Sequence, residues 1–178
     1  MLNEDKESKR FPYGTIVNQW SDKIEEGETA NYFEINGDEN STEIFEFLAD
    51  NSEVEYCQLK CSTNESEEVN YIGTSQKNDT ERSGGLLIKN KLIKEGSILR
   101  EYIHSHPSGL LWPSEQDTGF SKSVNNMFKN NNIIHKVYTK QTYNKLGNYK
   151  TYNEYSLKMT AGVFPLMFTN NPLLVKTR

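Results

Sequence analysis

The feature that most limits how this chain can fold is its small supply of apolar residues. Hydrophobic side chains make up 34% of the 178 residues, whereas a typical soluble domain has roughly 45–50% by a similar count. Leu, Ile, Val and Phe together number 40, a share just above the roughly 20% below which charged chains are usually disordered. We therefore expect one hydrophobic core and not two, with part of the chain outside it.

Composition also excludes several classes of protein. No apolar run approaches the roughly 20 residues that a membrane-spanning helix needs, and the charged first 11 residues predict no secretory signal. The two cysteines, Cys57 and Cys61, are too few for a disulfide scaffold and are expected to be ordinary thiols. The net charge of −5 argues against an extended nucleic-acid surface, which needs clustered positive charge.

Hydrophobic periodicity predicts a mixture of helices and strands. Residues 41–50 and 114–130 have the spacing of amphipathic helices, and Asn40 or Ser41 is expected to cap the first. Residues 86–93 fit either a helix or a strand. This alternation predicts an α/β or α+β fold. The strands are expected at residues 15–20, 30–35, 54–60, 69–75, 97–106, 132–140 and 149–159.

Polar segments mark the limits of the folded part. Residues 1–12 lack periodicity and are interpreted as a linker or a frayed terminus, which leaves one domain over residues 13–178. The apolar part of the tail after residue 160 is interpreted as a strand packed on that domain. Gly84 and Gly85 match no phosphate-binding pattern and are interpreted as a flexible point.

One short segment holds a pattern that can carry chemistry: His104-x-His106-Pro107, then Ser114-x-x-Asp117. Because alternate side chains of a strand share one face, His104 and His106 are expected to lie side by side. The loop that begins at Pro107 can bring Asp117, in the first turn of the next helix, beside them. Two imidazoles and one carboxylate leave a fourth corner for water, which is the arrangement of a catalytic zinc site.

Each half of this pattern also has a simpler explanation. A His-x-His pair alone is weak evidence for a metal, and Ser114-x-x-Asp117 alone is a helix capping box with Asp in place of Glu. The two roles of Ser114 can coexist, because a hydroxyl that caps a helix can also face the site. His135 lies in an apolar strand and is expected to be a packed histidine. Trp112 lies in the loop between the ligands, where it either packs that loop or lines a substrate groove.

The combined pattern resembles the JAMM motif of the JAB/MPN zinc metalloproteases: a Glu, a gap, His-Ser/Thr-His, seven residues, and Ser-x-x-Asp. The chain matches it at every defined position from His104 onward, and the order of elements over about residues 40–157 is also similar. The resemblance implies a mixed β-sheet flanked by helices. It also implies one Zn²⁺ per chain, bound by His104, His106 and Asp117 between a strand end and a helix N-terminus.

The resemblance assigns two further roles. Ser114 would stabilise the oxyanion of the tetrahedral intermediate, and a glutamate would act as general base. Glu55 is our choice for that base, because it opens the strand expected after the first helix. Glu53 is the alternative, two residues earlier and on the same face. The small residues and glycine that often follow the family's glutamate are missing here.

A closer resemblance is to the JAB-like toxin domains of bacterial polymorphic toxins, and residues 46–56 and 104–117 carry it. It implies a proteolytic effector, delivered as part of a longer secreted protein. Its substrate would be a ubiquitin-like or other target-cell protein, and its partner a cognate immunity protein. Other functions stay open at this point: a cytoplasmic housekeeping peptidase, an inactive MPN interaction module, and a metal-binding module without hydrolysis.

Overall fold

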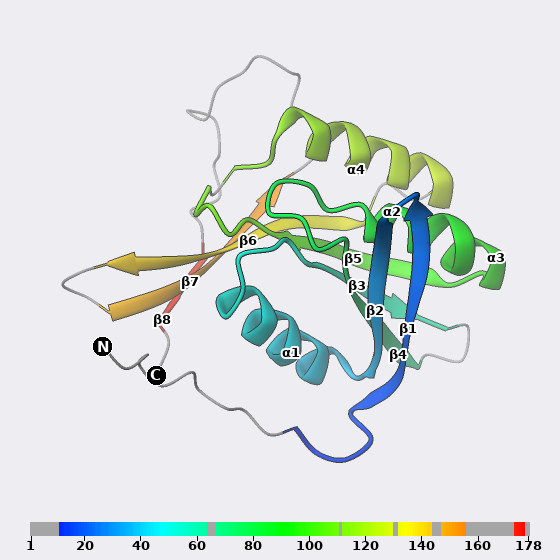
Figure 1. The fold of residues 1–178 in the computed structure, drawn as a ribbon, viewed down its shortest axis with the longest axis horizontal. Helices are drawn as coiled ribbons and strands as arrows, with labels where there is room; N and C mark the ends of the chain where they lie inside the picture. Colours follow the sequence, from blue (N-terminus) through cyan, green and yellow to red (C-terminus); the bar gives the residue numbers. More distant parts are fainter. Residues whose placement is uncertain are drawn as a thin grey trace.

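The fold is built on one eight-stranded mixed sheet with the strand order β1-β2-β4-β3-β5-β6-β7-β8 (Figure 1). The computed structural model describes residues 11–63, 67–110, 112–129, 132–143, 147–155 and 173–176. Neighbouring strands are antiparallel except β5 and β6, which are parallel. The strands are β1 (Ile16–Glu25), β2 (Glu28–Asn36), β3 (Cys57–Ser62), β4 (Glu68–Thr74), β5 (Ile98–Ser105), β6 (Ile134–Tyr143), β7 (Gly147–Tyr155) and β8 (Leu173–Lys176).

Helices cover both faces of this sheet (Figure 1). On one face, α1 buries Ile44 and Phe45 in a cluster with sheet residues such as Ile103. On the other face, a continuous helical run and α4 bury apolar residues such as Leu87 and Val124 against the sheet. The helices are α1 (Asp38–Asp50), then α2 (Ser83–Leu87), the π-helix η1 (Ile88–Leu92) and α3 (Ile93–Glu95) in one run, and α4 (Glu115–Phe128).

This arrangement confirms the expected fold class, a mixed sheet flanked by helices. Both expected helices and all seven expected strands are present, and residues 86–93, for which the sequence left two interpretations, are helical. Of the linker expected at residues 1–12, residues 1–10 lie outside the described residues, as do the apolar residues 163–168 of the tail. Phe11 is described and packs against the core cluster under α1.

The expected cap of the first helix is wrong. α1 begins after Gly37, which has a positive φ of 81° and no side chain that could cap the helix. The start is fixed instead by β4, since the Gly37 and Asp38 amides donate to the Glu68 carbonyl at 3.2 Å and carboxylate at 3.1 Å. Ser41 is buried in the first turns and accepts a hydrogen bond from Gln58 Nε2 at 2.8 Å.

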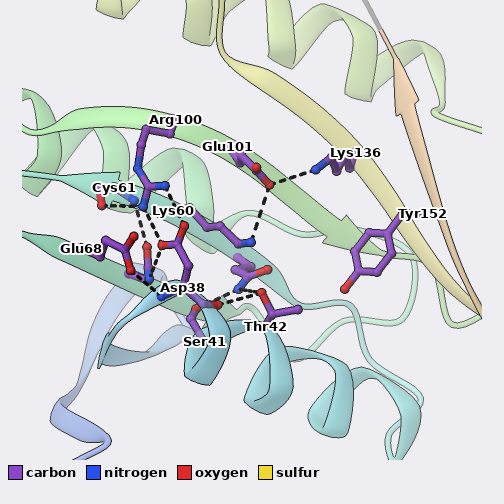
Figure 2. A network of polar contacts seen from close by, with 12 residues as sticks. Asp38, Ser41, Thr42, Lys60, Cys61, Glu68, Arg100, Glu101, Lys136 and Tyr152 are labelled. Atoms are coloured by element: carbon purple, nitrogen blue, oxygen red, sulfur yellow. Dashed lines mark hydrogen bonds and ion pairs between the residues drawn. The ribbon is translucent and has the colours of Figure 1, made fainter. Parts of the chain in front are cut away.

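The sheet face under α1 is unusually polar, as Figure 2 shows. The Arg100 guanidinium donates to both carboxylate oxygens of Asp38, at 2.6 and 2.7 Å. Farther along the same face, the Glu101 carboxylate lies 3.0 Å from Lys136 Nζ and 3.8 Å from Lys60 Nζ. These paired charges are half-buried, with side chains that are 14–32% exposed, at positions beside the core where charged residues are usually fully solvated.

A β-bulge in β5 brings Arg100 to this face. Lys60 pairs with Glu101, but the next residue of β3, Cys61, pairs with Leu99, so that Arg100 is an extra residue in the ladder. Such an insertion changes the face that the following side chains reach. Leu99 therefore packs in the core on the α4 side of the sheet, while Arg100 and Glu101 both serve the α1 side.

Gly84 is not a flexible point, which corrects the expectation from the sequence. It is buried in α2, and a Cβ atom there would lie 2.7 Å from Tyr102 Cε2 and 3.1 Å from Cys57 Sγ. At Gly85, a Cβ atom would lie 3.1 Å from the Phe120 ring. The two glycines therefore let the helix approach the sheet and α4 closely.

We predict that Gly84→Ala destabilises the protein, because overpacking of a tight interior contact costs about 1–3 kcal/mol. Gly119→Ala is the matched control, since Gly119 is also helical but a Cβ atom there meets nothing within 4 Å. That control should raise the free energy of unfolding by about 0.5–1 kcal/mol, the usual gain of Ala over Gly in a helix. Urea unfolding of both variants measures the difference, and equal effects would contradict the packing assigned to Gly84.

Candidate metal centre

His104 and His106 lie at the carboxyl end of β5, a central strand of the sheet. They are two residues apart on an extended strand and therefore project from the same face. Both are buried, at 2% and 7% exposure, and their Nε2 atoms are 3.0 Å apart. β5 ends at Ser105, so that His106 is the first residue after the strand, and a turn with Gly109 at φ 79° leads the chain toward α4.

The N-terminus of α4 supplies the carboxylate. Ser114 is the N-cap residue and Asp117 is the third residue of the helix, and the two form the capping box that the sequence predicts. Ser114 Oγ accepts a hydrogen bond from the Asp117 amide at 3.1 Å, and Asp117 Oδ2 accepts one from the Ser114 amide at 2.6 Å. This reciprocal pair fixes the Asp117 side chain relative to the helix axis.

Asp117 thereby reaches both histidines. Its Oδ1 atom lies 3.2 Å from His104 Nε2, and its Oδ2 atom lies 3.6 Å from His106 Nε2. Four-coordinate zinc binds its nitrogen and oxygen ligands at about 2.0–2.2 Å, which at the tetrahedral angle separates neighbouring ligand atoms by about 3.3–3.5 Å. The observed separations are 3.0, 3.2 and 3.6 Å, and the last two end on different oxygens of Asp117. One ligand atom from each residue lies within 4.8 Å of the others. The donor types and their closeness therefore suit a metal ion such as zinc.

The outer nitrogen of His106 fixes the protonation of its ring. Nδ1 lies 2.9 Å from the Leu110 carbonyl oxygen. Because a carbonyl only accepts, the proton is on Nδ1, and the lone pair of Nε2 is free to bind a metal. His104 Nδ1 is buried and has no hydrogen-bond partner among the described residues.

The charges of the cluster support each other. Burial raises the pKa of Asp117, but hydrogen bonds from His104 and His106 outweigh this effect and hold that pKa well below its usual range. Burial lowers the pKa of His106, whereas Asp117 and the Leu110 carbonyl raise it, and the net shift is upward. The site therefore carries a firmly ionised carboxylate beside His106, and a metal ion bound there would replace the proton that the raised pKa of His106 favours.

Glu55 lies beside this cluster and not within it. It precedes the first residue of β3 by two positions. Its backbone is held there by two hydrogen bonds: its amide donates to the Lys77 carbonyl at 2.7 Å, and its carbonyl accepts from Thr74 Oγ1 at 2.8 Å. The neighbouring residue Tyr56 exchanges two 2.9 Å hydrogen bonds with Ser105, so Glu55 lies opposite His106 across the strand pair.

The environment of Glu55 differs from that of Glu53. Glu55 is 8% exposed. Burial raises its pKa to about 7, with the charge of His106 opposing this shift and that of Asp117 adding to it. Glu53 is exposed and lies in a bend, not in a strand. Of the two candidates, only Glu55 is buried at the histidine end of β5.

The remaining candidates have other surroundings. Cys57 and Cys61 are free, buried thiols, and burial raises the pKa of both. Neither belongs to the cluster of potential metal ligands found among the described residues. His135 is 2% exposed, as expected of a packed histidine. Trp112 is half-buried in the loop before α4.

The sequence analysis missed Glu81. Its carboxylate accepts hydrogen bonds from the Ser83 hydroxyl, from the Ser83 and Gly84 amides at 2.7 and 3.1 Å, and from the Tyr102 hydroxyl at 3.3 Å. It thus holds the N-terminus of α2 close to the strand that carries the histidines. No local pattern predicts this role, because Tyr102 is distant in the sequence.

The fold and this cluster define a domain of the JAB/MPN class: a mixed sheet flanked by helices, with His-x-His ending a central strand and Asp in the next helical turn. A family model described as JAB-like toxin 1 matches residues 33–138, more than half of the chain. The chain therefore belongs to the JAB-like toxin 1 family, which confirms the resemblance seen in the sequence. Comparisons with curated proteins and with solved structures find no match.

The residues matched by this toxin family include Glu55, Ser114 and the three clustered residues His104, His106 and Asp117. Among the described residues, no helix is both long enough and apolar enough to cross a membrane.

We predict that Ser114→Ala lowers the free energy of unfolding of the metal-free protein by about 1 kcal/mol, because the N-cap hydrogen bond is lost. Ser123→Ala is the control: Ser123 is exposed on the same helix and donates only to the Gly119 carbonyl. Its effect should stay within about 0.5 kcal/mol. Equal urea midpoints for the two variants would show that the capping box does not stabilise α4.

Proposed function

We propose that this domain is a zinc-dependent hydrolase of peptide or isopeptide bonds and acts as the proteolytic part of a toxin. The observation that carries the proposal is the cluster of His104, His106 and Asp117, whose ligand atoms all lie within 4.8 Å of one another. The buried carboxylate of Glu55 at the same end of β5 supports it, because hydrolysis of an amide needs a base beside the metal.

Each residue would have a distinct role. His104, His106 and Asp117 would hold the ion, and a bound zinc ion would activate water and polarise the substrate carbonyl. Glu55 would accept a proton at its carboxylate and pass it to the leaving amine. Ser114 Oγ accepts the Asp117 amide and keeps its own proton, which it would donate to the developing oxyanion.

The family assigns the context of this activity. A toxin domain needs a target in another cell, and we propose that the target is a protein, ubiquitin-like or otherwise, that presents a peptide or isopeptide bond. Delivery as part of a longer effector and inhibition by a cognate immunity protein complete the proposal.

We predict that the purified protein contains about one zinc ion per chain, since the cluster offers one set of three ligands. His106→Ala should lose the metal, because only two ligands remain. Cys61→Ala should keep it, because that thiol lies outside the cluster. Elemental analysis after dialysis without chelator measures all three proteins. A wild type free of zinc, or a His106→Ala variant that still holds a full equivalent, would overturn the metal assignment.

We predict that Glu55→Gln keeps zinc but loses toxicity, because removal of a general base typically costs 10²–10⁴-fold in rate. The matched control is Glu53→Gln, at an exposed carboxylate two residues away. Growth of bacterial and yeast cells that express each variant gives the readout without a known substrate. Arrest by wild type and Glu53→Gln, with normal growth for Glu55→Gln, is expected. Equal growth of all three, or arrest by Glu55→Gln, would contradict the proposed role.

A further inference from the structure

The inner face of α4 carries a row of polar side chains that continues from the metal ligand. Asp117, Ser121 and Asn125 are spaced by four residues and therefore lie above one another on one side of the helix. Ser121 and Asn125 are almost completely buried, at 0% and 2% exposure. An interior helix face normally presents apolar residues to a sheet, so this row needs a specific explanation.

Each buried member of the row has a polar partner on the sheet. Ser121 Oγ donates to the Asp117 carbonyl at 2.9 Å and lies 3.2 Å from the Tyr155 hydroxyl of β7. A serine hydroxyl can donate one hydrogen bond and also accept, and so can a tyrosine hydroxyl, so both contacts of Ser121 can be satisfied together. One turn farther on, Asn125 Oδ1 lies 2.9 Å from Nε2 of His135 on β6.

The two sheet partners form a single unit. His135 and Tyr155 are paired in register between β6 and β7, and their ring centroids are 5.9 Å apart. They are 2% and 4% exposed, so no water competes freely for their hydrogen bonds. A shift of α4 along the sheet would break both contacts and leave buried polar atoms unpaired, which is costly. Apolar contacts alone would resist such a sliding motion far less.

We propose that His135, Asn125, Ser121 and Tyr155 are positioning residues for the metal centre, which fix α4 so that the Asp117 carboxylate meets both histidines. This inference rests on the proposed function, because it concerns the same metal. It adds residues that touch neither the ion nor the substrate. The distance from Asp117 to the two imidazoles depends on where α4 sits, and these residues make directional contacts between α4 and the sheet in addition to those of Asp117 itself.

The chemistry of His135 suits this role in a second way. Asn125 Oδ1 can only accept, so the proton of His135 is on Nε2, and Nδ1 is an acceptor. His104, bound to a metal through Nε2, keeps its proton on Nδ1. Both Nδ1 atoms are buried without a partner among the described residues, and the two rings stand on the same face of β5 and β6. Metal-binding histidines almost always use their second nitrogen as a donor, and no hydrogen bond joins these two Nδ1 atoms among the described residues.

The test measures zinc affinity by chelator competition, and melting temperature by calorimetry on the metal-free protein. His135→Phe keeps the shape of a buried ring without the donor, and Asn125→Leu removes the acceptor. Each should weaken zinc binding by about 10-fold, the lower end of the effect of losing an outer partner of a metal ligand, because neither residue bonds a ligand directly. The double variant should bind zinc no more weakly than the weaker of the two single variants, because the two residues form one contact. Tyr155→Phe, which loses one oxygen only, should reduce affinity in the same direction.

Two further variants separate positioning from general destabilisation. Ile44→Ala removes core volume on the opposite face of the sheet and should lower the melting temperature while zinc affinity stays unchanged. His135→Gln keeps a side-chain N–H for Asn125 and should restore much of the affinity lost in His135→Phe. If His135→Phe does not fold, Tyr155→Phe and His135→Gln give the comparison.

The outcomes distinguish the two levels of the proposal. If the polar variants melt earlier but bind zinc as tightly as wild type, or if Ile44→Ala loses affinity equally, the positioning role is wrong. If the wild-type protein itself binds no zinc, the proposed metal-dependent function is wrong, whatever the polar variants do.

Discussion

The reciprocal pair of hydrogen bonds between Ser114 and Asp117 is the interaction on which the metal centre depends. It starts α4, and it directs the carboxylate of Asp117 toward the end of β5. One oxygen of that carboxylate closes the capping box while the other faces His104. The contact that caps α4 therefore also brings the third potential ligand to the two histidines. The explanation of Ser114-x-x-Asp117 as a cap is confirmed. The same aspartate belongs to a cluster that could hold a metal ion, and its role as a metal ligand stays a prediction.

Local rules made this part of the structure predictable. The two-residue spacing of His104 and His106 on a strand, and the position of Asp117 in the first helical turn, follow from backbone periodicity alone. The same is true of α4 and most of the strands. Glu55 was preferred over Glu53 from its place before β3, and the structure buries Glu55 alone; its role in catalysis stays a prediction.

The features that the sequence could not predict depend on contacts between segments that are distant in the chain. The start of α1 at Gly37 depends on Glu68 of β4, so the local cap signals at Asn40 and Ser41 were misleading. The sequence suggested that Gly84 is a flexible point, but a glycine is needed there because a Cβ atom would collide with Tyr102 and Cys57. Ser121 and Asn125 have the composition of a solvated helix face, and only the sheet explains why they are buried.

The shortage of apolar residues now has a structural explanation. Paired charges lie under α1, and a row of hydrogen-bonded side chains lies under α4, so that polar groups complete both faces of a small core. Buried polar contacts add less net stability than apolar ones, but they specify geometry more strictly. Such contacts suit the proposed function, which depends on where one carboxylate lies relative to two imidazoles.

X-ray absorption at the zinc edge of the metal-loaded protein tests the central claim most directly. The account predicts four nitrogen or oxygen neighbours at about 2.0–2.2 Å, with the multiple scattering of two imidazoles and no sulfur. A sulfur neighbour at about 2.3 Å, or the scattering of three imidazoles, would contradict the assignment of the metal to His104, His106 and Asp117.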